Sequence, residues 1–142
     1  MLQQIWTSPS RMNIVCVDSY DEGVMKGRFY SHEGTGECFS SLSQFLLKME
    51  EQLDQTKLPQ AYTSPRTFSM FLEQDYEEPP MPAVRKGQRA TFELKVIFRQ
   101  HSSWQGVILW REGKQEFSFR SVLELIFLMD SALRCLEVKE AG

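Results

Sequence analysis

Residues 103 to 133 read SWQGVILWREGKQEFSFRSVLELIFLMDSAL and carry most of the information on the fold. They combine two apolar strand candidates, a turn and the most hydrophobic helix candidate in the chain. A weaker copy, GRFYSHEGTGECFSSLSQFLLKMEEQL, occupies residues 27 to 53. Gly27 and Phe39 match Gly106 and Phe119, an offset of about half the chain. Hairpin-and-helix segments share part of this pattern by convergence, but the polar matches favour a duplicated supersecondary module.

Those polar matches are helix start signals. Ser41 is followed three residues later by Gln44, and Ser121 is followed in the same way by Glu124. In such a capping box the serine oxygen accepts a hydrogen bond from a first-turn N–H, and the Gln or Glu reaches back to the serine N–H. Each helix is therefore expected to begin directly after its serine.

The two helices differ in how much of their surface is apolar. Both have one apolar stripe at helical spacing, but the second adds Leu123, Phe127 and Leu128. Burying such a side chain contributes roughly 1.5–3 kcal/mol, so three of them are not expected to face water together. Either the middle of the chain covers them or a second copy of the chain does. Leu123, Phe127 and Leu128 are therefore candidate interface residues, and in the second case we expect a homodimer.

Three strands are predicted before each helix, and short connections make neighbouring strands antiparallel. The expected ranges are 12–20, 24–31, a short strand ending at Phe39, 92–99, 104–111 and a strand through Phe117 and Phe119. The first helix is bounded by Pro59, and the second is expected to fray near Glu137. The predicted fold class is α+β, with two pseudo-symmetric β-β-β-α repeats forming an antiparallel sheet on which two helices pack.

The chain of 142 residues suits a single domain, 1–142. Repeat one spans 12–54, a proline-rich middle segment spans 55–91, and repeat two spans 92–136. Within the middle segment, 67–72 is a further strand candidate and 73–82 is an acidic, proline-rich loop candidate.

Alternation assigns the faces of the two longest strands of repeat two. Phe92, Leu94, Val96 and Phe98 share one face of the first, with Arg99 on the other. In the second, matching to repeat one points Trp104, Gly106, Ile108 and Trp110 toward the helices. Ile97, Val107 and Leu109 would then form an apolar patch on the open face, and they complete the candidate interface residues.

The net charge of −3 conceals an asymmetry. Residues 1–83 carry 6 basic and 12 acidic side chains, whereas residues 84–142 carry 10 basic and 7 acidic. Basic side chains near aromatic ones suit single-stranded nucleic acid, which makes Lys95, Arg99 and Arg111 candidate contacts. The acidic balance of the whole chain and the inward direction expected for the tryptophans argue against this use.

Candidate chemistry is sparse. His32, Glu33, Glu37 and Cys38 lie close together in sequence, but a metal site needs ligands held by rigid elements, and solvated loop residues are the expected outcome. The chain has neither a GxxxxGK[ST] nor a GxGxxG phosphate loop. We therefore expect no catalytic residues, no metal and no cofactor.

Cys16, Cys38 and Cys135 are widely spaced, which favours buried thiols in a reducing compartment over disulfides. No apolar run reaches the roughly 18 residues of a membrane span. The first residues lack the pattern of a secretory signal. These observations favour the cytoplasm.

The run FRQHSSWQGVILWREGKQEFSFRSVLELIFLMDSAL is similar to small uncharacterised proteins of gut-type Firmicutes. The similarity covers mainly residues 92–133 and, more loosely, FSSLSQFLLKMEEQLD. The resemblance implies a bacterial, cytoplasmic setting and supplies no activity and no functional residues.

The leading hypothesis is a non-enzymatic interaction or structural protein that associates with itself through the second helix or the open sheet face. The alternative is a single-stranded nucleic-acid-binding module that uses the basic second half.

Overall fold

The computed structural model describes residues 12–31, 36–56 and 86–141, and the side chains among them except those of 56 and 136–141. The described elements are β1 (Met12–Asp21), β2 (Val24–Tyr30), β3 (Gly36–Phe39), α2 (Leu42–Thr56), β4 (Ala90–Phe98), β5 (Gln105–Trp110), β6 (Gln115–Phe119) and α3 (Val122–Ala141). The strands form one antiparallel sheet in the order β3-β2-β1-β4-β5-β6. The predicted α+β class with two helices on an antiparallel sheet is confirmed.

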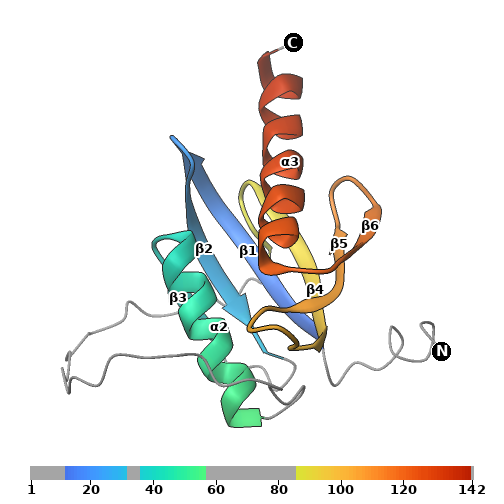
Figure 1. Ribbon diagram of the computed structural model, residues 1–142. Coiled ribbons are helices and arrows are strands. Elements are labelled where there is room, and N and C mark those ends of the chain that lie inside the picture. The colour runs from blue at the N-terminus through green and yellow to red at the C-terminus, as the bar shows by residue number, and fades with distance from the viewer. Residues whose placement is uncertain (1–11, 32–35, 57–85, 142) are drawn as a thin grey trace.

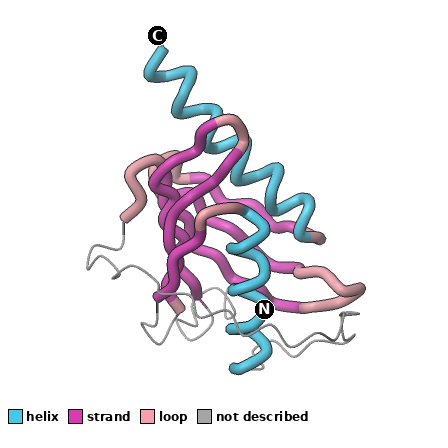
Figure 2. The backbone as a smooth tube through the Cα atoms, turned by 90° about the vertical axis from the view of Figure 1, so that its left-hand side faces the viewer, coloured by secondary structure: helices cyan, strands magenta, loops and turns pink. Residues whose placement is uncertain are grey.

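Both helices lie on the same face of the sheet (Figures 1 and 2). The first, α2, packs against β2 and β3, and α3 packs against β5 and β6. The C-terminal turns of α3 project past the ends of the strands (Figure 1). Each helix therefore covers one half of the sheet, and β1 and β4 lie at the centre.

The two halves meet where β1 pairs with β4. The register places Val15 opposite Phe92 and Asn13 opposite Leu94, with Ile14 opposite Glu93 between them. Among the described strands this is the one ladder that links the first three strands to the last three. Its inward-facing Val15, Phe92 and Leu94 are buried beneath the helices, where they belong to the core.

Both central strands contain an irregularity of the β-bulge type. In β1 the register shifts between Val17 and Ser19, and in β4 it shifts between Val96 and Phe98. An extra residue reverses the alternation of side chains beyond it. The predicted faces of Phe98 and Arg99 were therefore wrong: Phe98 is exposed, and Arg99 is buried against α2.

The helices begin as the capping boxes predict, at Leu42 and Val122. The Ser41 Oγ accepts from the Gln44 N–H at 3.2 Å, and the Ser121 Oγ accepts from the Glu124 N–H at 3.2 Å. The reciprocal bond goes one residue further back than predicted. Gln44 accepts from the N–H of residue 40 at 2.6 Å, and Glu124 accepts from the N–H of residue 120 at 3.0 Å.

The helix α3 continues to Ala141, past the residue near which fraying is predicted, and neither proline nor glycine interrupts it. Pro59, the strand candidate 67–72 and the loop candidate 73–82 lie outside the described residues.

The core is a layer of aliphatic and aromatic side chains between the sheet and both helices. As predicted, Trp104 and Ile108 belong to it, and Trp110 packs against it. The ring of Phe45 on α2 lies edge-on to Trp104, with 6.4 Å between centroids. It also contacts Phe29 at 5.5 Å and Phe39 at 5.1 Å. Through Phe45, α2 touches side chains from both halves of the chain.

Two glycines allow the close approach of neighbouring strands beside the bulges. A Cβ on Gly27 would collide with the backbone carbonyl of Cys16, and a Cβ on Gly106 would collide with that of Lys95. We expect Gly27→Ala and Gly106→Ala each to lower the free energy of unfolding by roughly 1–3 kcal/mol, because a backbone must move to admit the methyl group. Urea denaturation measures the change.

The control is Gly23→Asn, since Gly23 has a φ of 78° with no atom near its missing Cβ, and asparagine tolerates that conformation. Equal stabilities for the Gly106→Ala variant and the unmodified protein would contradict the described register of β4 and β5.

Candidate functional site

The outward face of α3 carries two large apolar side chains. Leu123 is 59% exposed and Phe127 is 62% exposed, and they lie one turn apart on the helix. Leu128 differs from the expectation, because it is half-buried and packs against the core. The described surface of α3 therefore presents two of its three predicted interface residues to solvent.

The matched face of α2 is more polar. Leu47, which occupies the position of Phe127, is 73% exposed. Around it on the outward side lie Ser43, Glu51 and Asp54. A single exposed leucine among polar groups is ordinary for a solvated helix, whereas a pair one turn apart forms a continuous apolar strip.

The other three predicted interface residues do not form an open patch. Ile97 and Val107 are buried, and Leu109 is half-buried. Val107 and Leu109 flank the core residue Ile108 and so lie on the sheet face away from the helices, but that face also buries the polar residues Arg28, Thr91 and Lys95. The open apolar surface expected there is absent from the described part of the chain.

The candidate nucleic-acid contacts do not come together on an accessible surface. Lys95 has no exposed area, and it lies between Met12 and Val107 on the neighbouring strands. Arg99 is 3% exposed and forms ion pairs with two carboxylates of α2. Only Arg111 reaches solvent among these three residues, and it pairs with Glu93 at 3.2 Å. The described positions therefore do not form the basic groove that this use requires.

Arg99 instead anchors α2 to the second half of the sheet. Its Nη1 donates to Glu50 at 2.9 Å and to Asp54 at 2.7 Å. The Glu50 carboxylate also accepts from the indole N–H of Trp104. If either Glu50 or Asp54 were lost, Arg99 would keep the other carboxylate, so only the loss of both would leave its buried charge uncompensated. The sequence placed Arg99 outward because the bulge that redirects it leaves no sequence signal.

A corresponding contact ties α3 to the first half. The hydroxyl of Tyr20 on β1 donates to Asp130 on α3, and Arg134 donates to the same carboxylate at 3.0 Å. The hydrogen bond from Tyr20, and secondarily the bond and charge of Arg134, hold the pKa of Asp130 below its ordinary value. On the exposed side of the helix, the hydrogen bonds and charge of Arg120 lower the pKa of Glu124.

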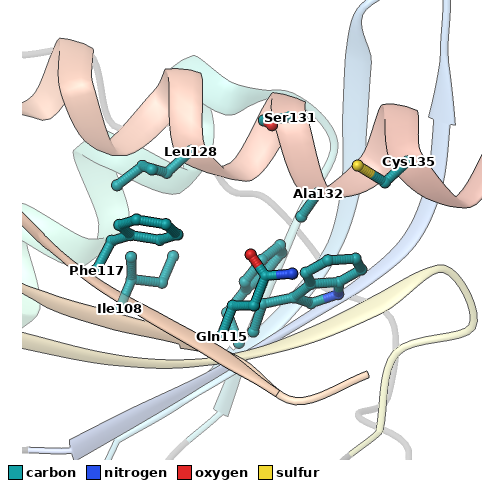
Figure 3. Close-up of a pocket in the computed structure, with 9 residues that line it drawn as sticks. Ile108, Gln115, Phe117, Leu128, Ser131, Ala132 and Cys135 are labelled. Carbon is teal, nitrogen blue, oxygen red and sulfur yellow. The ribbon is translucent and has the colours of Figure 1, made fainter. Parts of the chain in front are cut away.

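A pocket lies between α3 and the β5–β6 hairpin and encloses about 80 Å³. Its apolar walls are Phe92, Ile108, Phe117, Leu128 and Ala132. Figure 3 shows Leu128 and Ala132 on the helix facing Ile108 and Phe117 on the strands. Because Phe117 is exposed, the pocket reaches the surface beside the outer edge of the sheet.

The remaining lining residues are polar or polarisable: Trp110, Gln115, Ser131 and Cys135. The indole Nε1–H of Trp110 is buried and has no hydrogen-bond partner among the described residues. A buried donor without a partner costs about 1–3 kcal/mol, and such groups are rare in native structures. None of the described lining side chains carries a charged group of Asp, Glu, Lys or Arg.

Sequence reasoning missed this pocket. The available signal was the contrast between matched helix positions, since α3 has Leu128 and Ala132 where α2 has Lys48 and Gln52. On α2 the Lys48 ammonium donates to the carbonyl of Cys38 at 2.7 Å. Leucine cannot make that contact.

The three cysteines are free, and only Cys16 is buried. Burial raises the pKa of the Cys16 thiol. Cys38 is half-buried and Cys135 is exposed, so the expectation of buried thiols was wrong for those two.

Of the metal candidates, His32 and Glu33 lie outside the described residues. Within 12–31, 36–56 and 86–141, no group of three or more His, Cys, Asp or Glu side chains is placed to hold a metal ion. Neither described helix is long and apolar enough to cross a membrane.

No protein-family model, curated protein or solved structure matches the chain.

The Tyr20–Asp130 contact makes stability depend on pH. A carboxyl whose pKa is lowered by folding contributes stability above its unfolded pKa and loses it as the pH falls through the folded pKa. We expect Tyr20→Phe to lower the free energy of unfolding by roughly 1 kcal/mol at pH 7, with a smaller difference below about pH 4. Urea denaturation at pH 7, 5 and 3 measures both effects. A difference that is the same at all three pH values would show that the Asp130 charge is not involved.

Proposed function

We propose that the protein is a non-enzymatic interaction protein that forms a homodimer through the outward face of α3. The observation that carries this proposal is the exposed apolar strip of Leu123 and Phe127. Large apolar side chains exposed side by side on a folded chain favour contact with another apolar surface.

A second copy of the chain is the occupant that the local charges favour. A two-fold dimer uses the same patch twice, so the patch must complement itself. If two α3 helices pair antiparallel with Leu123 beside the partner's Phe127, Arg120 of each copy comes beside the partner's Asp130. Both of these side chains already form ion pairs on the same helix, with Glu124 at 3.1 Å and with Arg134 at 3.0 Å. The antiparallel register would extend the two pairs into a network across the interface.

The duplicated fold is part of the proposal, and three geometric correspondences support it. The register pairs Gly27 with Phe39 and Gly106 with Phe119. The bulges follow Val17 and Val96, which are 79 residues apart, as are Gly27 and Gly106. In the contacts Arg99–Glu50 and Tyr20–Asp130, a strand residue of one half bonds to a carboxylate on the helix of the other half.

The burial of the helices fits the same relation. From residue 41 to residue 50 and from 121 to 130, buried, half-buried and exposed positions follow one another in the same order. We infer that an ancestral β-β-β-α unit was duplicated, and that the outward faces of α2 and α3 diverged afterwards.

The proposed setting is the bacterial cytoplasm. Free thiols at Cys16, Cys38 and Cys135 fit a reducing compartment. The bacterial part of the proposal rests only on the resemblance of residues 92–133 to small Firmicutes proteins.

We expect the protein to sediment as a dimer at micromolar concentration, and Leu123→Glu or Phe127→Glu to weaken the dimer. The dissociation constant should rise roughly thirtyfold or more, because a central apolar contact is typically worth at least about 2 kcal/mol. Sedimentation equilibrium measures it.

The matched control is Leu47→Glu, which places the same charge at the corresponding exposed position of α2 and should leave the dimer unchanged. If the unmodified protein remained a monomer even at 100 times the micromolar concentration of this experiment, the homodimer proposal would be wrong. Equal weakening by Leu47→Glu would assign the effect to net charge.

The duplication has its own test. In an experimental structure, residues 12–31 and 36–56 should superpose on 91–110 and 116–136 after a rotation close to two-fold. A rotation far from two-fold, or unlike strand order in the halves, would contradict it.

A further inference from the structure

We propose that the homodimer contact extends from α3 onto the edge strand β6, where Phe117 of each copy packs against Leu123 of the other copy. This inference rests on the proposed homodimer and specifies which part of each copy its partner covers. Three observations support it: the area that a stable dimer needs, the continuity of the apolar surface, and the contrast with the matched surface around α2.

Leu123 and Phe127 are too few to hold a stable dimer by themselves. Specific protein interfaces bury roughly 800 Å² on each partner. A large aromatic side chain contributes only about 150–250 Å² when it is completely buried. A stable dimer therefore requires further apolar surface next to the strip of Leu123 and Phe127.

That surface lies on the flank of α3 that faces β6. Phe117, in the middle of β6, is 54% exposed. Its ring faces Leu128 across the pocket, as Figure 3 shows. Leu128 follows Phe127 directly, and Ser131, one turn after Phe127, also lines the pocket. Apolar and uncharged side chains therefore connect the strip on α3 to Phe117.

The opposite flank of α3, toward β1, is charged at Asp130. The carboxylate of Asp130 accepts hydrogen bonds from Tyr20 and from Arg134. An apolar contact that extended in this direction would take an ionised group out of water, which is costly. The contact can therefore grow at lower cost on the side of β6 than toward the centre of the sheet.

The matched surface around α2 shows that the fold itself does not require apolar groups at these positions. The strand registers equate Phe117 with Glu37, since Phe117 pairs with Ile108 and Glu37 pairs with Phe29. Four matched positions are polar or charged in the first half and are apolar or uncharged in the second. Named with the second half first, they are Phe117 and Glu37, Leu123 and Ser43, Leu128 and Lys48, and Ser131 and Glu51. The loss of charge on one surface of helix and edge strand together is typical of the centre of an interface.

The antiparallel, two-fold arrangement of the α3 helices brings these groups together. The partner's Leu123 packs beside Phe127 and thereby comes close to Phe117 on the β6 side. The same contact then occurs twice, as a two-fold interface requires. Glu116 pairs with Leu109 and lies on the opposite face of the sheet, so the acidic side chain of β6 stays outside the contact.

Sedimentation equilibrium of Phe117→Glu tests the inference. We expect the dissociation constant of the dimer to rise roughly tenfold, because the variant places a charge in an apolar contact. The matched control is Ser118→Glu, which adds the same charge to the same strand but on the opposite sheet face, since Ser118 pairs with Val107. This control should leave the dissociation constant unchanged. Circular dichroism checks that both variants are folded.

A cross-linking experiment decides the matter if Phe117→Glu does not fold. Cys38 and Cys135 are first replaced by serine, because neither is buried. Equal amounts of a Phe117→Cys chain and a Leu123→Cys chain are then mixed and treated with a short bismaleimide. We expect a product that joins residue 117 of one chain to residue 123 of the other, identified by mass spectrometry. With Ser118→Cys in place of Phe117→Cys, this product should not form.

The inference is overturned, while the homodimer stands, if Leu123→Glu weakens the dimer and Phe117→Glu does not. Equal weakening by Ser118→Glu also overturns it, as does a sample that sediments as a dimer but yields no product between residues 117 and 123. An unmodified protein that is a monomer at every concentration would instead contradict the proposed function, and this inference with it.

Discussion

The pairing of β1 with β4 is the constraint on which the rest of the structure depends. It is the ladder that joins the two halves of the described sheet, and it runs from the pair Met12–Lys95 to the pair Val17–Ala90. Both central strands bulge beyond this ladder, and both then approach a glycine on the next strand. A shift of one residue would turn Val15, Phe92 and Leu94 out of the core, so burial specifies the register strongly.

The bulges also determine how the helices are held. Past the irregularities, Tyr20 and Arg99 point to the helix side, where each meets a carboxylate on the helix of the opposite half. Each helix thus packs on the hairpin of its own half and is hydrogen-bonded to a central strand of the other half. The core packing and the cross-half hydrogen bonds fix the inner surface of each helix, and the serine caps fix its first turn. The side chains on the outer surface and on the flank can therefore differ between the helices without altering the fold. Differences between α2 and α3 fall at those places, at Leu123, Phe127 and Leu128.

Local signals made most of the architecture predictable from sequence. The serine caps placed the helix starts, and alternation with turn residues placed six strands to within about two residues at most ends. Alternation could not predict the bulge in β4, because one extra residue leaves no signal in the sequence. Beyond the bulge the side chains change faces, so Phe98 is exposed and Arg99 is buried. Lys95 and Val107 illustrate a second limit, since their burial on the far face depends on tertiary context that charge and polarity do not reveal. The pocket at Trp110 required side chains from three strands and a helix, which no local pattern brings together.

In the described part of the chain, the outermost strands of the sheet are also the shortest: β3 has four residues and β6 has five. Glu37 lies on the first and Glu116 on the second. A neighbouring chain that tried to extend the sheet would gain few backbone hydrogen bonds and would meet acidic groups at either margin. The short length and the acidic residues of β3 and β6 therefore disfavour strand addition at both rims of the described sheet.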